Sequence, residues 1–215
     1  MQISKETIGF LKSFSGINQS IWVDPGQVIK TMSPQKTVIA TAKVAEEFGV
    51  AFGIYDLQQF LGVVSLFDEP EFNFKKDSVE IASGRSKTRY RYVAKNLLVT
   101  APEKDLQFPD SAVTFDVSGD DLKTLMQSAN VLGLPHICVE SRDNELVMFA
   151  TDDDESASNE YSISVGPGTS PSKYKFRVDN LRLMPGAYEI SISDNSISKF
   201  KCHDTDVVYF IATEI

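Results

Sequence analysis

Apolar residues recur at helical spacing in two places that lie far apart in the chain. The first pattern follows Ser4 and the second follows Ser118, and serine is a favoured helix N-cap. The apolar positions are Phe10, Leu11 and Phe14 in the first pattern, and Leu122, Leu125, Met126 and Ala129 in the second. The spacing predicts two amphipathic helices, each with one buried side.

The segments after the two helices also match each other. Ile21–Val23 and Ile137–Val139 are predicted strands that follow the helices, and each leads through a sharp turn into another strand. Further on, Phe52–Leu57 and Phe176–Leu181 share an alternating strand that runs into an Asx-led helix start. A longer loop at Asp152–Glu160 explains the shift in register between the copies. The chain is therefore predicted to be an α+β protein with two similar domains, each a β-sheet with two helices on one face.

A segment with little periodicity separates the two copies and contains Pro102 and Pro109. Such a segment is typical of an interdomain connector. We therefore expect an N-terminal domain at 1–94, a connector at 95–112 and a C-terminal domain at 113–215.

The composition of the 215 residues is that of a globular protein, with 42% hydrophobic and 24% charged residues. The sequence has neither an apolar run of membrane-spanning length nor a basic, then apolar N-terminus typical of a secretory signal. Cys138 and Cys202 are isolated and are interpreted as reduced thiols. We expect a cytoplasmic protein with no membrane partner.

The formal net charge of −9 argues against a protein that binds DNA on an open basic face, because phosphate contacts dominate the affinity of such proteins. It leaves open a protein that surrounds the duplex with a weakly basic inner surface and an acidic exterior.

An ordered set of short segments adds a family resemblance. They are Ser4–Thr7, Leu11–Lys12, Ile54–Leu57, Phe60–Gly62, Ser111–Thr114 and Met184–Tyr188. The set resembles the sliding clamps of T-even-like tailed bacteriophages, collinearly from Met1 to about Ala212. The resemblance implies a homotrimeric ring of two-domain subunits that encircles double-stranded DNA, with helices lining the hole and sheets outside. It also implies a clamp without enzymatic activity or cofactor, which an ATP-driven clamp loader places on DNA. Its further implied roles are to tether the replicative DNA polymerase and to support late transcription.

Four basic residues are candidates for the DNA-facing surface. Lys5 and Lys12 lie one heptad apart, on a helical stripe opposite Phe14. Lys123 lies on the side of the second predicted helix away from its apolar face, although phage clamps carry more arginine in that helix. Arg182, in a predicted short helix, matches a basic position of the family. A solvated helix face is the alternative interpretation of the two N-terminal lysines.

The predicted connector carries apolar side chains that no helix or strand period requires: Leu97, Leu98, Val99, Leu106 and Phe108. Clamp partners insert a short apolar tail into a pocket near the domain junction, so the resemblance implies a partner-binding role for these residues. Alternatively, they attach the connector to the two domain sheets.

Basic residues also alternate at Arg85, Lys87, Arg89 and Arg91 along one predicted strand. We interpret this strand as solvated surface, an edge protected by charge, or a subunit contact.

No catalytic or metal site is predicted. Asp152–Glu155 lacks the glycine and the distal glutamate of a calcium-binding loop, so an acidic surface loop is favoured. Cys202–Asp204 alternates across a predicted strand and cannot converge on one metal, and His136 is an isolated histidine. P-loop, nucleophile-elbow and HExxH patterns are absent from the sequence.

Two other functions remain open from the residues. One is a ring-forming, β-rich viral structural or scaffold protein, which has no need of the Lys5 and Lys12 stripe. The other is a nuclease or phosphatase built around Asp152–Glu155, which divalent-metal-dependent cleavage of DNA would reveal.

Overall fold

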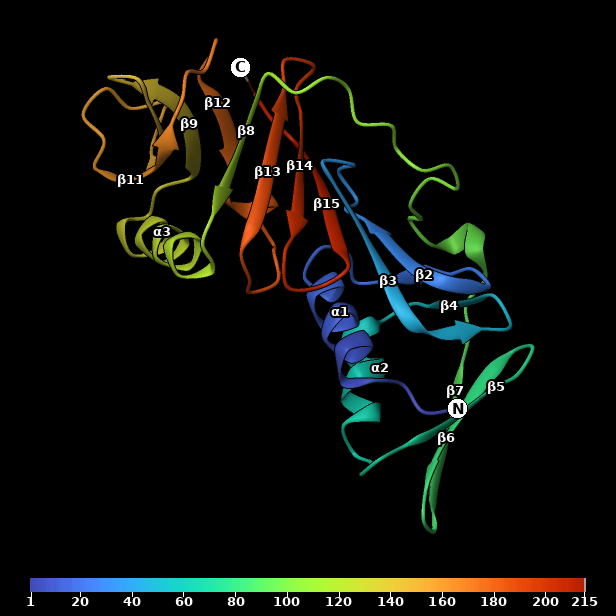
Figure 1. The fold of residues 1–215 in the computed structure, drawn as a ribbon. Coiled ribbons are helices and arrows are strands. Elements are labelled where there is room, and N and C mark those ends of the chain that lie inside the picture. Colours follow the sequence, from blue (N-terminus) through green and yellow to red (C-terminus); the bar gives the residue numbers. More distant parts are fainter. Residues whose placement is uncertain (215) are drawn as a thin grey trace. The chain divides into compact units, whose positions relative to one another are not determined.

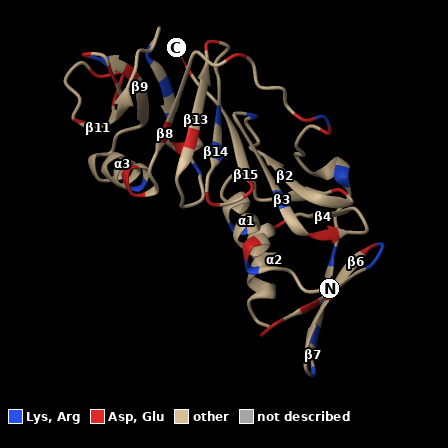
Figure 2. Cartoon of the chain, viewed as in Figure 1, with Lys and Arg blue, Asp and Glu red and all other residues tan. Residues whose placement is uncertain are grey.

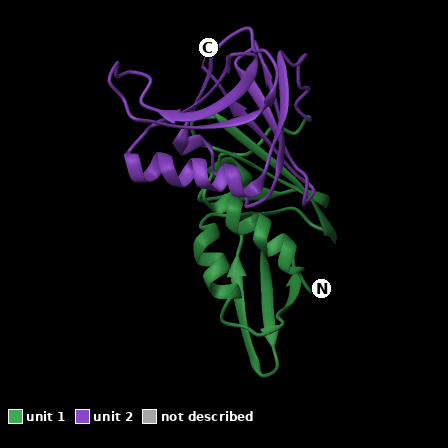
Figure 3. Ribbon diagram, turned by 60° about the vertical axis from the view of Figure 1, so that its left-hand side comes forward, with its two compact units in different colours: residues 1–104 green, residues 105–215 purple. Residues whose placement is uncertain are grey.

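A computed structural model describes residues 1–214 of the chain. The chain divides into two compact units, Met1–Lys104 and Asp105–Ile215, which Figure 3 colours separately. The division falls inside the segment 95–112 that the sequence predicts as a connector.

The first unit begins with a helix and ends with a three-stranded sheet (Figure 1). Its elements, in chain order, are α1 (Lys5–Ser15), β1 (Ile21–Val23), β2 (Gly26–Met32), β3 (Val38–Phe48), β4 (Phe52–Ile54), α2 (Leu57–Val64), β5 (Glu71–Phe74), β6 (Ser78–Ser83), β7 (Ser86–Arg91) and the 3-10 turn η1 (Lys95–Leu97). All pairings within the unit are antiparallel: β1 with β4, β2 with β3, and β5-β6-β7 in order.

Both helices of the first unit start at side-chain caps that the sequence indicates. The Ser4 hydroxyl accepts a hydrogen bond from the Thr7 amide at 3.1 Å, and the Asp56 carboxylate accepts one from the Gln59 amide at 2.8 Å. The buried side chains lie at helical spacing, as Thr7, Phe10, Leu11 and Phe14 in α1 and as Leu57, Phe60, Leu61 and Val64 in α2. Each helix therefore buries one side and exposes the other.

In its described residues, 105–214, the second unit contains one α-helix and two four-stranded sheets. Its elements are β8 (Val113–Val117), α3 (Gly119–Leu132), β9 (His136–Arg142), β10 (Glu145–Thr151), β11 (Glu160–Pro167), β12 (Tyr174–Arg177), the 3-10 turn η2 (Val178–Asn180), β13 (Tyr188–Ser193), β14 (Ile197–Cys202) and β15 (Val207–Ala212). The sheets have the antiparallel orders β11-β10-β9-β12 and β15-β14-β13-β8.

The helix α3 has the ends that its sequence predicts. The Ser118 hydroxyl accepts from the Asp121 amide at 3.1 Å, and the helix ends at Gly133, whose positive φ of 67° suits glycine. The buried residues are Leu122, Leu125 and Ala129.

The strand order confirms that the chain is a repeat. The pairs β1–β4 and β2–β3 correspond to β9–β12 and β10–β11, and the sheet β5-β6-β7 corresponds to β13-β14-β15. Even β8, which pairs with β13, has a counterpart, because Gln2 forms an isolated bridge with Glu71 of β5. The predicted long loop also lies where expected, since 152–159 joins β10 to β11 whereas 33–37 joins β2 to β3.

One expectation is wrong in the second unit, which lacks the second helix predicted after β12. Only the 3-10 turn η2 forms there, and Arg182 follows it outside any helix. The segment from Asp179 to Met184 is only six residues long. Pro185 follows it, and a proline disfavours the helical conformation of the residue before it. So short a helix cannot offset its nucleation cost.

Two tyrosines hold the segment that replaces this helix. The Tyr188 hydroxyl donates to the Met184 carbonyl at 2.7 Å, and the Tyr209 hydroxyl accepts from the Met184 amide at 3.2 Å. Both rings are fully buried. The segment is therefore held in a non-helical form by its own unit.

No helix within residues 1–214 is both long and apolar enough to cross a membrane.

Candidate DNA-facing and partner-binding surfaces

The helix α1 exposes both lysines that the sequence singles out. Lys5 and Lys12 lie on the solvent side of the helix, and both line a groove of about 960 Å³ between α1, α2 and the segment that follows α2. Asp68 and Glu69 line the same groove. The groove therefore carries charges of both signs.

The start of α1 is fixed to β3 by a buried carboxylate. Glu46, 9% exposed, accepts hydrogen bonds from the Ser4 amide and, at 2.5 Å, from the Thr7 hydroxyl. Burial acts to raise the pKa of Glu46, but the hydrogen bonds from Thr7 and Ser4 outweigh it and hold that pKa below its ordinary value. The carboxylate is therefore charged near neutral pH, and it sets the position of the turn that carries Lys5.

The exposed side of α2 has no charge. Gln58, Gln59, Gly62 and Ser65 are exposed there, while the apolar side is buried. Such a surface neither attracts nor repels a phosphate backbone strongly.

In the second unit the two basic candidates differ. Lys123 is exposed on α3 and lines a groove of about 750 Å³ beside the segment that replaces the missing helix. Arg182 is exposed as well, but its Nη2 lies 3.1 Å from the Asp179 carboxylate. The charge of Arg182 is therefore partly balanced by its own neighbour.

Figure 2 colours blue the basic positions along β7 and the turn before it, and strand alternation places these residues in a stripe on one face. Tyr90, which alternates with Arg89 and Arg91, packs against Phe60 of α2 with ring centroids 5.2 Å apart. All four basic residues of the stripe are exposed, and none forms an ion pair within residues 1–214. The stripe therefore occupies the sheet face opposite α2.

The connector residues divide into two groups. Leu97 is 65% exposed and Val99 is 39% exposed, whereas Leu98, Leu106 and Phe108 are half-buried. A Leu98 methyl packs so closely on β4 that a Cβ at Gly53 would lie 2.9 Å from it.

Phe108 likewise contacts a sheet, within the second unit. Its ring centroid lies 6.3 Å from that of Phe210, and the Lys199 ammonium lies 5.3 Å from the Phe108 centroid. Leu98 and Phe108 therefore attach the connector to the units, and Leu97 and Val99 are accessible.

A small pocket of about 180 Å³ lies beside the connector, and the sequence did not predict it. Trp22, Val28 and Pro102 contribute its apolar lining, and Thr100, Ala101 and Glu103 lie at the connector side. Val28, at 42% exposed, is an apolar side chain left open on a strand. The single tryptophan of the chain was the available signal, but only folding brings it beside the connector.

The fold is that of a DNA clamp. The structure is similar to that of A. fulgidus PCNA bound to the C-terminal region of FEN-1, with a TM-score of 0.73, 10% identity and coverage of 100% of this chain and 97% of that chain. It is also similar to PCNA of Thermococcus kodakaraensis, with a TM-score of 0.70, 16% identity and coverage of 98% and 96%. At these identities the likeness shows the fold alone.

Sequence comparison gives the family. The model of the DNA polymerase processivity factor matches residues 4–98, and that of the gp45 sliding clamp C-terminal domain matches 114–215. The sliding clamp of Vibrio phage KVP40 is 33% identical over 222 residues, which cover 100% of this chain and 99% of that one. The sliding clamp of Enterobacteria phage T4 is 29% identical, over 88% of this chain and 86% of its own. The chain belongs to the phage gp45 sliding-clamp family of DNA polymerase processivity factors.

Proposed function

We propose that three copies of the chain close into a ring around duplex DNA and tether the replicative polymerase. An ATP-driven clamp loader opens and places the ring, and the ring also supports late transcription, in the cytoplasm of the infected host. The protein acts as a non-catalytic scaffold, and the domain limits 1–94 and 113–215 flank its connector. The repeated unit carries the proposal, because three copies of a two-unit chain supply the six similar units of a closed ring.

The strand edges support head-to-tail closure. Among residues 1–214, β7 pairs only with β6, and β11 pairs only with β10. Each therefore leaves a row of backbone donors and acceptors for another chain. Joining the β7 edge of one copy to the β11 edge of the next is a heterologous contact, which closes when the rotation per copy suits a ring.

Native mass spectrometry at micromolar concentration tests the assembly, and the expected mass is that of a trimer. Hydrogen exchange at high and low concentration tests the edges, since amides of β7 and β11 should exchange more slowly when the trimer forms. A monomer under all conditions, including with DNA and loader, would refute the ring. Protection of other strands alone would refute the assigned edges.

We propose that Lys5, Lys12, Lys123 and Arg182 face the DNA. The net charge of −9, the carboxylates in the groove of Lys5 and Lys12, and the pairing of Arg182 all favour a weak electrostatic hold. The ring should accordingly bind short linear duplexes barely at all at physiological salt, remain on circular DNA after loading, and leave when the circle is cut. Tight binding to linear DNA without a loader would contradict this topological mode.

Changing Lys5 and Lys12 together to alanine should lower loading efficiency and leave the trimer mass unchanged. The matched control changes Lys76 and Lys104 to alanine, which removes the same charge from exposed positions outside α1 and outside the proposed edge strands β7 and β11. If the two double variants load with equal efficiency, the α1 lysines have no specific role in DNA binding.

We propose that the polymerase tail docks beside the connector, where Leu97 and Val99 are accessible and Trp22 and Val28 line a pocket. Burying two apolar side chains contributes roughly 3–6 kcal/mol before association costs, which suits exchangeable binding. The measurements are affinity for the polymerase C-terminal peptide and thermal stability.

Leu97→Ala should lower peptide affinity with an unchanged melting temperature, whereas Leu98→Ala and Phe108→Ala should lower the melting temperature because their side chains attach the connector. Unchanged affinity in Leu97→Ala would place the binding pocket elsewhere.

A further inference from the structure

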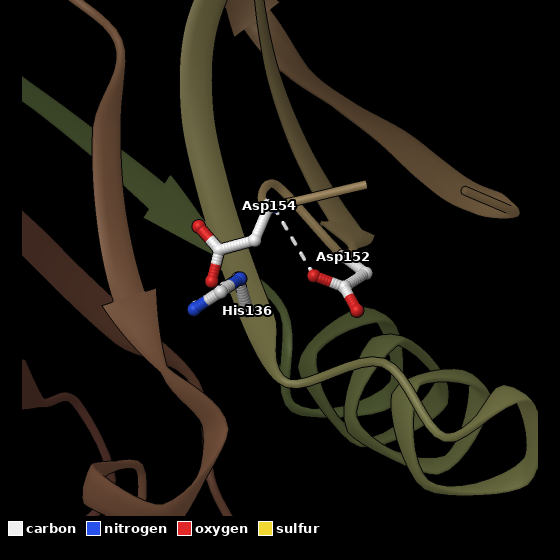
Figure 4. Close-up of side chains that lie close together, drawn as sticks. All are labelled: His136, Asp152 and Asp154. Atoms are coloured by element: carbon white, nitrogen blue, oxygen red, sulfur yellow. Dashed lines mark hydrogen bonds between the residues drawn. The ribbon is translucent and has the colours of Figure 1, made fainter. Parts of the chain in front are cut away.

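Folding brings together three metal-ligating side chains that the sequence leaves apart. His136 begins β9, and Asp152 and Asp154 lie in the loop after β10. One ligand atom from each of the three lies within 4.8 Å of the others. Figure 4 shows the Asp154 carboxylate beside the imidazole of His136, with the Asp152 carboxylate directed toward the same place. The pairing of Thr151 with His136 in the sheet makes this juxtaposition, because it returns the loop to the start of β9.

The His136 imidazole is buried, and its Nδ1 acts as an acceptor on the side of the acidic loop. His136 is 5% exposed, and the Asp153 amide donates a long hydrogen bond of 3.3 Å to its Nδ1. An Nδ1 that accepts a hydrogen bond carries no proton, so its lone pair points toward the loop. A cation at Nδ1 would replace this long contact with a coordinate bond.

The nearby lysines have closer partners than the cluster. Lys173 pairs with Asp153, and the Lys175 ammonium lies 3.0 Å from the Glu214 carboxylate but 3.9 Å from that of Asp154. No lysine or arginine within residues 1–214 forms an ion pair with Asp152. Two carboxylates and an imidazole therefore converge, and the lysine nearest to Asp154 has its closer partner in Glu214.

We propose that His136, Asp152 and Asp154 form a binding site for a divalent transition-type cation, with Zn²⁺ the best match. Imidazole nitrogen and carboxylate oxygen are both zinc ligands in proteins, and a water would complete four ligands. Magnesium and calcium prefer six or more oxygen ligands, which makes the imidazole a poor partner for either.

The dimensions require a small contraction. Ligands about 2.1 Å from a tetrahedral zinc lie about 3.4 Å from one another. The ligand atoms lie within 4.8 Å of one another, so their separations must close by up to about 1.4 Å. Asp154, whose side chain is 77% exposed, is free to supply this movement by changing its rotamer.

The site would tie the 152–159 loop to the start of β9 and so fix the approach to β11, the edge strand of its sheet. This inference does not depend on the ring or on DNA binding, and its test uses the chain alone.

The chain has two histidines, so imidazole NMR signals provide an internal comparison. His203 pairs with Asp116 at 2.7 Å, at the start of the turn after β14, and serves as the reference. Titration with Zn²⁺ should shift the His136 signals saturably at one equivalent, and Mn²⁺ should broaden them before those of His203. Lack of response to both ions at millimolar concentration would refute the site.

Asp152→Asn and Asp154→Asn should each weaken Zn²⁺ binding at least tenfold, because each removes one anionic ligand while keeping the side-chain shape. Asp116→Asn is the matched control and should leave the affinity unchanged. Unaltered affinity in the Asp152→Asn, Asp154→Asn double variant, with normal folding by circular dichroism, would show that zinc binds elsewhere.

Discussion

Replacing Glu46 with glutamine tests whether one buried carboxylate holds α1 on the first unit. The substitution keeps the shape of the side chain but exchanges one charged acceptor oxygen for an NH₂ group, which faces the Ser4 amide or the Thr7 hydroxyl. A hydrogen bond to a charged group contributes about 1.5–3 kcal/mol, and a donor left unpaired at this 9% exposed site adds to the loss. We expect Glu46→Gln to lower the free energy of unfolding by about 2–3 kcal/mol.

The effect should depend on pH with a definite sign. The pKa of Glu46 is lower in the folded chain than its ordinary value of 4.5, so the folded state favours the ionised form. The stability that this carboxylate contributes is present above pH 4.5 and is lost as the pH falls through the folded pKa. The stability difference between the wild type and Glu46→Gln should therefore be constant near neutral pH and shrink below pH 4.5.

Urea denaturation at several pH values measures this difference. Glu47→Gln is the matched control, because Glu47 is the next residue of β3, is exposed, and loses the same charge in the substitution. If both variants lose the same free energy, or if the Glu46→Gln difference is the same at pH 3.5 and pH 7, the reasoning about the buried carboxylate is refuted.

Two further predictions concern packing and backbone anchoring. Gly53→Ala should lower the free energy of unfolding by about 1–3 kcal/mol, because the added Cβ would lie 2.6 Å from a backbone carbonyl oxygen. The control Gly49→Ala places its Cβ where nothing lies within 4 Å, so its melting temperature should equal that of the wild type. Tyr188→Phe should lower the free energy of unfolding by about 1–2 kcal/mol, because the Met184 carbonyl loses its hydroxyl donor. The control Tyr161→Phe removes a hydroxyl that makes no hydrogen bond within residues 1–214, so differential scanning calorimetry should show an unchanged melting temperature.

Local patterns gave the helices and most strands correctly because their causes are local. Ser4, Asp56 and Ser118 cap helices through their own side chains, and the apolar spacing marks the buried sides. The expected helix near Arg182 failed because the Asx-led start resembles a cap, whereas Pro185 and the short length prevent the helix from forming.

The sequence predicted the charged surfaces of α1 and β7 only in part. The spacing of Lys5 and Lys12 placed both on the exposed side of α1, and the alternation at Arg89 and Arg91 placed them on one face of β7. The carboxylates of Asp68 and Glu69 beside the α1 lysines were unexpected, because they reach the groove from the segment after α2. Likewise, sequence spacing left His136 and the acidic loop as separate features.

The sequence by itself determined the repeat, the capped helices, the alternating strands and the family, since each depends on residue order or on neighbours a few positions apart. Only the tertiary structure decided which distant groups meet: Glu46 with the start of α1, Leu98 with β4, and Asp154 with the imidazole of His136. The physical reason is that strand pairing brings together residues far apart in sequence, and no local pattern specifies which side chains then converge.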